Sequence, residues 1–142
     1  MNCLRFIGII AAVLSLAAVA TGETDEQYHE WMLQSQAHLA ASLENVETDP
    51  QRVAEAARGL QETFKQVEAF WLQRDAPLAQ RFASSLLEGA AAVEKAASEG
   101  DTGELNRLLA SRVRINCIRC HKAYRERSPE GGYRIKTPDP GR

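Results

Sequence analysis

The clearest periodic segment of the chain runs from Pro50 to Arg74 and reads PQRVAEAARGLQETFKQVEAFWLQR. Apolar residues recur in it at alternating spacings of four and three, the pattern of a helix that packs along one face in a bundle. These residues are Val53, Ala57, Leu60, Phe64, Val67 and Trp71. The segment begins at Asp49 and Pro50, where an aspartate can cap free amide groups and a proline is tolerated in the first turn. The spacing predicts a long amphipathic helix.

Three further helices are predicted around this segment, over residues 25–47, 77–100 and 103–127, because helix-forming residues dominate and no alternating apolar run suggests a strand. In the first, the inward stripe is Tyr28, Met32, Leu39, Leu43 and Val46. In the third it is Phe82, Leu86, Ala90, Val93 and Ala97, and in the fourth Leu105, Leu109, Val113, Cys117, Cys120 and Tyr124. Short connections between long helices predict an all-α, antiparallel up-down-up-down four-helix bundle with no sheet.

The two ends of the chain differ from this helical region. Residues 1–20 have a basic start at Arg5, an uncharged apolar stretch and a small-residue ending, which predicts a secretory signal peptide cleaved after Ala20. The apolar stretch is too short to span a bilayer, so the mature protein is expected in the periplasm and not across a membrane. Residues 128–142 are rich in proline and glycine and cannot continue the helix of the 21–127 domain. This tail is expected either to be disordered or to lie over the edge of the cofactor predicted from residues 117–121.

Charge and cysteine content exclude several classes of function. Without the signal peptide the chain has 16 basic and 19 acidic residues, a formal charge of −3, which argues against a nucleic-acid partner. Only two cysteines remain, and both lie in one five-residue motif, so there is no disulfide framework. No acid–base pair or nucleophile constellation suggests catalysis, and we do not expect an enzyme.

The motif Cys117-Ile118-Arg119-Cys120-His121 carries the chemistry. Two thiols three residues apart can add across the two vinyl groups of one haem, and the histidine beside the second thiol can then ligate the iron. On a helix these three side chains stand at i, i+3 and i+4 and face the same side. The motif therefore predicts one covalently bound haem c, with iron ligated by His121.

Three other uses of these cysteines agree less well with the sequence. A thioredoxin-like redox pair would need a βαβ surround, which the sequence lacks. A structural zinc site would need a fourth ligand, and only His29 or His38 is a plausible source. A disulfide inside one helical turn would be strained.

The segment from Arg114 to Arg125, RINCIRCHKAYR, resembles the final helix of the cytochrome c-prime family. These are class II c-type cytochromes, four-helix bundles with the haem near the C-terminus. With residues 97–100 and Leu105 before it, the segment is also similar to the soluble periplasmic b-type bundle cytochrome, whose haem is held by an N-terminal methionine and a C-terminal histidine.

The resemblance implies thioether bonds from Cys117 and Cys120 and a proximal ligand from His121. It also implies that Arg125 lies near the haem. The alternative, which stays open, is that Arg125 is a solvated basic residue near the end of the helix. Tyr124 is expected to pack beside the haem or to be an ordinary core residue.

The function then depends on which side chain of the first helix opposes His121. Met32 and its neighbour Leu33 both fall near the family's distal position, and only one can face the iron, because adjacent helical residues point about 100° apart. Met32 is in register with Leu39 and Val46, whereas Leu33 leads to the charged Glu47. We therefore favour Met32 as sixth ligand of an electron-transfer protein.

Two alternatives to this ligation remain open. If Leu33 faces the iron, the protein resembles the five-coordinate family members that bind NO or CO. Ligation by two histidines is a further alternative, in which His38 is a better candidate than His29.

Partner surfaces are less defined by the sequence. The last helix is rich in arginine, which indicates a solvated face, contacts to the haem propionates, or a docking patch for an acidic redox partner protein of the periplasm. Trp31 and Trp71 lie either at a homodimer contact, as in family members that dimerise through their first two helices, or at half-buried edges of the monomer core.

Overall fold

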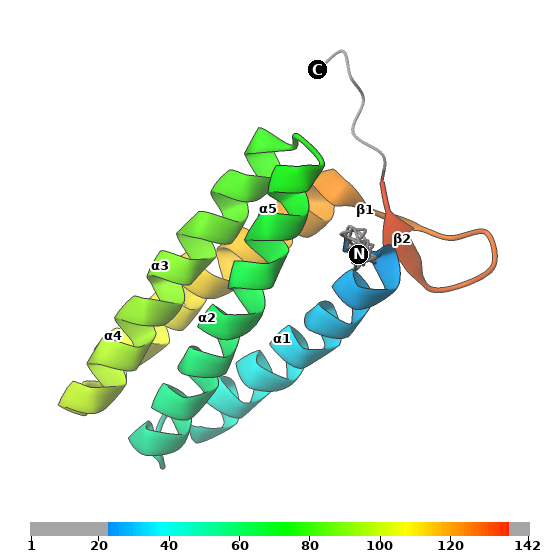
Figure 1. The fold of residues 1–142 in the computed structure, drawn as a ribbon. Helices are drawn as coiled ribbons and strands as arrows, with labels where there is room; N and C mark the ends of the chain where they lie inside the picture. Colours follow the sequence, from blue (N-terminus) through cyan, green and yellow to red (C-terminus); the bar gives the residue numbers. More distant parts are fainter. Residues whose placement is uncertain (1–22, 137–142) are drawn as a thin grey trace, which may run out of the picture.

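The computed structural model describes residues 23–136. Four helical rods form an antiparallel bundle, which confirms the all-α fold (Figure 1). The first three are α1 (Asp25–Asn45), α2 (Pro50–Gln73) and α3 (Pro77–Glu99). The last is continuous but has three segments: α4 (Thr102–Leu108), the π-helical η1 (Leu109–Arg114) and α5 (Ile115–Tyr124). Within residues 23–136, no helix is long and apolar enough to cross a membrane. The predicted signal peptide, its cleavage site after Ala20 and the last six residues of the tail lie outside the described residues.

Side-chain caps explain why the helices begin where they do. Thr24 and Gln27 form a reciprocal capping box before α1. Asp49 accepts a hydrogen bond from the Arg52 amide at 3.0 Å, and Asp101 accepts one from the Glu104 amide at 2.9 Å. Helices α1 and α2 therefore start at their predicted residues, and α4 starts one residue before the predicted position, whereas α3 starts at its predicted Pro77 without a side-chain cap.

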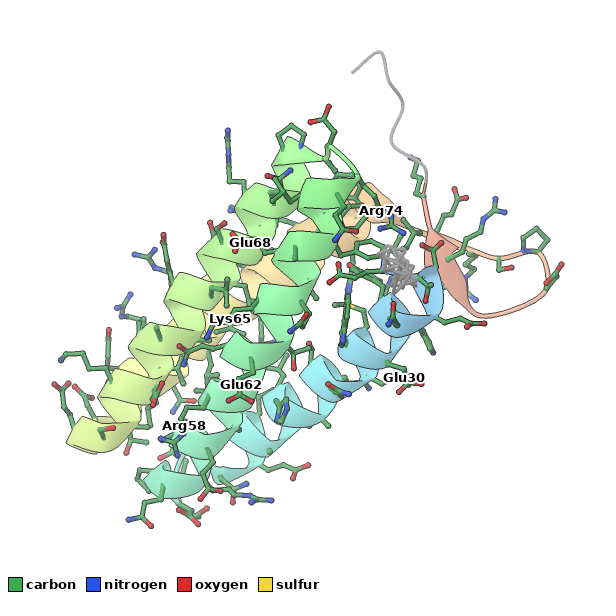
Figure 2. The ribbon with its side chains drawn as sticks, viewed as in Figure 1. Glu30, Arg58, Glu62, Lys65, Glu68 and Arg74 are labelled. Carbon is green, nitrogen blue, oxygen red and sulfur yellow. The ribbon has the colours of Figure 1, made fainter. Side chains whose placement is uncertain are left out.

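The predicted seam of α2 forms the centre of the core. All six of its apolar residues are buried, and Leu86, Ala90, Val93 and Ala97 of α3 are buried with them. The other side of α2 carries charged residues, of which Arg58, Glu62, Lys65 and Glu68 are labelled along the helix in Figure 2. One of them, Arg58, pairs with Glu94 of α3 at 3.2 Å. The alternation of apolar and charged residues thus sets the orientation of α2 about its own axis.

Helix α1 departs from its predicted stripe. Leu43 is 41 % exposed, so its assignment to the core is wrong, and Ser42 beside it is fully buried instead. The Ser42 hydroxyl donates to the His38 carbonyl oxygen at 3.0 Å, which satisfies it without a partner on another helix. Gly59 of α2 lies against the His38 ring, where an added Cβ would overlap that ring. Small residues at this crossing, rather than a large apolar one, let α1 approach α2 closely.

A π-helical turn determines which side chains of the last helix point toward the core. Leu105, Leu109, Val113 and Cys117 are four residues apart, and each such step on an α-helix overshoots a full turn by about 40°. Three steps would carry Cys117 about 120° off the core face. The wider turn of η1, with i to i+5 bonding, absorbs this drift. As a result Leu105, Leu109 and Val113 are buried and Cys117 still packs against the core.

The chain after α5 folds back as a small antiparallel hairpin, so the prediction of no sheet is wrong. Strand β1 (Arg125–Arg127) pairs with β2 (Tyr133–Ile135), with Glu126 opposite Arg134. The last helix ends at Tyr124, three residues before its predicted end, because Arg125 is already extended at φ −119° and ψ 132°. Gly131 and Gly132 make the turn at positive φ, a conformation that glycine adopts without strain.

The crossing of α3 and η1 generates a stability prediction. A Cβ added at Gly89 would lie 2.9 Å from the Arg112 Cβ and 3.2 Å from its backbone carbonyl. Gly89→Ala should therefore push the two helices apart and lower the free energy of unfolding by about 1–3 kcal/mol, as measured by urea denaturation. Gly103→Ala is the matched control, because its Cβ would meet only Asp101 Oδ1 at 3.6 Å. A Gly89→Ala variant as stable as the control would contradict this account of the crossing.

Candidate functional site

A cleft separates the N-terminal half of α1 from α5. Its inner part, about 100 Å³, lies among α1, α2, α3 and α5, and its outer part, about 890 Å³, opens between the first turns of α1 and the hairpin. Figure 1 shows these turns, in blue, beside the red β2 strand. The two parts share the lining residues Tyr28, Met32, Gln36, Cys120 and His121. The outer volume is in the range of sites for small molecules and cofactors.

The Cys-x-x-Cys-His motif lies on α5 and turns its three functional side chains into this cleft. Cys117, Cys120 and His121 all line the inner part, and the two cysteines are not joined by a disulfide. The residues between the cysteines point outward: Ile118 is 56 % exposed and Arg119 is exposed. Because the segment is helical, the spacing of the motif is sufficient to gather both thiols and the imidazole on one wall.

The environment of the thiols disfavours thiol–disulfide chemistry. Burial raises the pKa of Cys117 to about 11, and burial with the neighbouring Cys117 raises the pKa of Cys120 to about 12. Reactive cysteines show the opposite shift, because the thiolate is the nucleophile. At neutral pH the protonated thiol is therefore favoured for both side chains, which disfavours thiol–disulfide exchange in the folded bundle.

The imidazole of His121 is kept in its neutral form. Burial lowers its pKa, and the positive charge of Arg125 lowers it further. A neutral imidazole has a free nitrogen lone pair, which is what a metal ligand requires. Arg125 is thus close enough to influence His121, and its guanidinium stacks over the Tyr133 ring at 4.2 Å from the centroid. Tyr124, the other residue that the resemblance singled out, lines the outer part.

The opposite wall is formed by α1. Met32 is half-buried and lines both parts of the cleft, whereas Leu33 is 49 % exposed and lines only the outer part. His29 is exposed at the mouth of the outer part. His38 does not line the cleft, because its ring lies against Gly59 where α1 crosses α2. Of the four predicted candidates, Met32 is the one placed deepest opposite His121.

Ser35 is a site residue that the sequence reasoning missed. It is 8 % exposed and lines the inner part, and its hydroxyl has no hydrogen-bond partner among the described residues. The hydroxyls of Ser42, Thr63, Ser98 and Ser111 each donate instead to the carbonyl four residues earlier. Ser35 is one turn after Met32 and seven residues from both Tyr28 and Ser42, and that heptad spacing could have identified it. The Ser35 hydroxyl is therefore free to donate to an acceptor atom placed in the cleft.

An aromatic cluster supports the wall behind Cys120. The Tyr28 ring lies 4.4 Å from Phe70 and 5.5 Å from Trp71, and Trp71 lies 4.9 Å from Tyr124, centroid to centroid. Trp71 is 1 % exposed, which excludes it from the homodimer contact that the sequence left open, while Trp31 is half-buried. The cluster joins α1, α2 and the end of α5, and so fixes the position of the motif.

Within residues 23–136, no three histidine, cysteine, aspartate or glutamate side chains gather closely enough to hold a metal ion. Comparisons of the chain with protein-family models, with curated proteins and with solved structures gave no match.

The raised thiol pKa values have a measurable consequence in protein prepared without a cofactor. At pH 8 the thiolate fraction of Cys117 should be about 100-fold lower than in the urea-unfolded chain, because its pKa of about 11 lies two pH units above the ordinary value of 9.0. Alkylation by iodoacetamide should therefore be slow when the protein is folded and should accelerate as the pH rises toward 11. Equal rates for the folded and unfolded chains would contradict the burial of these thiols.

Proposed function

We propose that the protein is a periplasmic single-haem c-type cytochrome that transfers one electron at a time. In this proposal Cys117 and Cys120 hold the haem through thioether bonds and His121 ligates the iron. The observation that supports it most strongly is the placement of both thiols and the imidazole on one wall of a single cleft. The assignment to the periplasm rests on the signal-peptide pattern of residues 1–20.

The residues present fit a haem in three respects. The inner cleft is walled by the apolar side chains of Leu39, Leu60, Phe64, Val67 and Phe82, which suit a flat apolar macrocycle. The neutral imidazole of His121 presents a lone pair, and no third cysteine lies among the described residues to compete for attachment. When bound, haem supplies an iron that changes between the ferric and ferrous states, and the protein contributes ligands, burial and hydrogen bonds.

Met32 is the proposed sixth ligand. It lies on the wall opposite α5, lines both parts of the cleft and carries the only thioether of residues 21–142. A thioether opposite a histidine makes a six-coordinate electron carrier and raises the reduction potential. The half-exposed Leu33 and the displaced His38 are less suited to this position.

Electron exchange with a partner protein is proposed to occur near the exposed side of α5. Ile118 and Arg119 stand between the two cysteines and are both exposed, so this surface gives a partner access to the helix that carries the motif. The exposed Arg114 and Lys122 add positive charge there. A redox partner with an acidic docking surface would fit this charge.

The proposal is tested first by acidified organic extraction of protein matured in a host that attaches haem c. A haem absorption band that stays with the protein is expected, and a colourless protein would overturn the proposal. Met32→Ala should then convert a low-spin spectrum to a high-spin one, with loss of the weak long-wavelength band of thioether-ligated ferric haem. Leu33→Ala is the matched control and should leave the spectrum unchanged. If Met32→Ala also leaves it unchanged, methionine ligation is excluded.

A second candidate function is binding of NO or CO by iron that His121 alone ligates. The free hydroxyl of Ser35 favours it, because this buried donor shares the inner cleft with His121 and can donate to an iron-bound ligand. On this reading Met32 is flexible core filling and not a ligand.

Loss of that hydroxyl tests the second candidate. Ser35→Ala should release nitric oxide from the ferrous protein about five-fold faster, the effect of one lost hydrogen bond. Ser42→Ala is the control, because the Ser42 hydroxyl is also buried on α1 but already donates to the His38 carbonyl. Stopped-flow dissociation rates measure both variants, and identical rates would exclude a role for Ser35 in ligand binding.

A further inference from the structure

The C-terminal hairpin is attached firmly to the mouth of the cleft. The Lys136 amide donates to the Tyr124 carbonyl oxygen at 2.8 Å, which ties the end of β2 to the end of α5. Ile135 is half-buried and packs against the core. Tyr133, Arg134 and Ile135 all line the outer cleft, facing the first turns of α1. This segment is therefore one wall of the cleft.

The two walls of the outer cleft carry opposite charges. On α1 the lining residues include Asp25, Glu26 and Glu30, of which Asp25 is paired with Arg74 at 3.0 Å. On the other side stand Arg125 and Arg134. An anionic group in the mouth is repelled by the α1 side and attracted to the hairpin side, so this asymmetry orients whatever the cleft holds.

The contacts of Arg134 leave some of its guanidinium N–H groups free to bind another acceptor. Its Nε and Nη2 both contact Glu126 Oε1 across the strand pair, at 2.8 Å each. A guanidinium has five N–H donors, so this arrangement leaves several of them free. Arg127 is on the same hairpin, with its guanidinium 5.5 Å from the Tyr133 ring centroid, but it does not line the cleft.

We propose that the hairpin is a strap across the mouth of the haem cleft and that Arg134 binds a propionate carboxylate of the haem. This inference rests on the proposed function and deepens it. Arginine suits a carboxylate because its planar fork matches the two oxygens, and charge-assisted hydrogen bonds are the strong ones. The contact makes the hairpin part of the cofactor site. The hydrogen bond to the Tyr124 carbonyl holds one end of the strap, and the propionate holds Arg134 over the cleft.

Hydrogen exchange of the Lys136 amide in the haem-loaded protein tests the proposal. Arg134→Gln and Glu126→Gln both remove the cross-strand ion pair, but only Arg134→Gln removes the carboxylate contact. Exchange in Arg134→Gln should therefore be about ten-fold faster than in Glu126→Gln. Arg127→Gln should exchange as the unmodified protein does, and Arg134→Lys should recover part of the protection because it keeps the charge. Equal exchange in the Arg134→Gln and Glu126→Gln variants, at a rate below that of an unstructured chain, would overturn the assignment.

If the hairpin is fully open in both Arg134→Gln and Glu126→Gln, their exchange rates are equal for that reason alone. The reduction potential of the haem then provides a second readout. Arg134→Gln should lower the potential more than Arg127→Gln, because a cation beside the haem disfavours the ferric state. Equal shifts would overturn the assignment of Arg134. A protein that retains haem but shows equal exchange or equal shifts overturns only the strap, whereas one without covalent haem overturns the proposed function itself.

Discussion

The cleft exists because α1 diverges from α2 toward its start, where the large ring of Tyr28 maintains the contact with α2 (Figure 1). Near the connection between the two helices, the fully buried Ser42 and the contact of His38 with Gly59 bring the backbones together. Toward its start, α1 presents Tyr28, Met32 and Ser35 to the space in front of α5. Close packing of small residues at one end and larger side chains at the other is what turns a solid core into a site. Every candidate cofactor contact of α1 depends on this divergence.

The chemistry of the site follows from burial. A Cys-x-x-Cys pair on an exposed helix has thiol pKa values near the ordinary range, whereas the apolar cleft raises the pKa of both thiols and so favours their protonated form. His121 is held neutral by the same burial. The site therefore presents two protonated thiols and a free imidazole nitrogen, a set that suits the attachment and ligation of one prosthetic group better than thiol exchange. The unpartnered Ser35 hydroxyl adds a polar contact that the apolar walls do not otherwise provide.

The sequence correctly predicted the parts of the fold that large apolar side chains determine. The seam of α2 was correct at all six positions, and the predicted cap at Asp49 starts that helix. Prediction failed where small or polar residues decide the packing. Ser35 and Ser42 carry no hydrophobic signal, so Leu43 was preferred although it is exposed. The hairpin was missed because three-residue strands are too short to show an alternating pattern. The roles of Cys117, Cys120, His121 and Met32 stay predictions that the experiments above address.

The π turn also makes chain length a functional variable. A π turn contains one more residue than the α-helical turn it replaces, so conversion of η1 to regular α-helix at unchanged chain length would rotate everything after it by about 100°. The motif, the aromatic contact of Tyr124 and the hairpin would all turn together, away from a cleft whose other walls had not moved. A substitution in this segment changes one side chain and leaves the rotation of the helix after it unchanged. Chain length is different, because deletion of one residue keeps the facing of α5 only if the π turn is lost with it, so the number of residues between Leu105 and Cys117 is matched to the presence of the π turn.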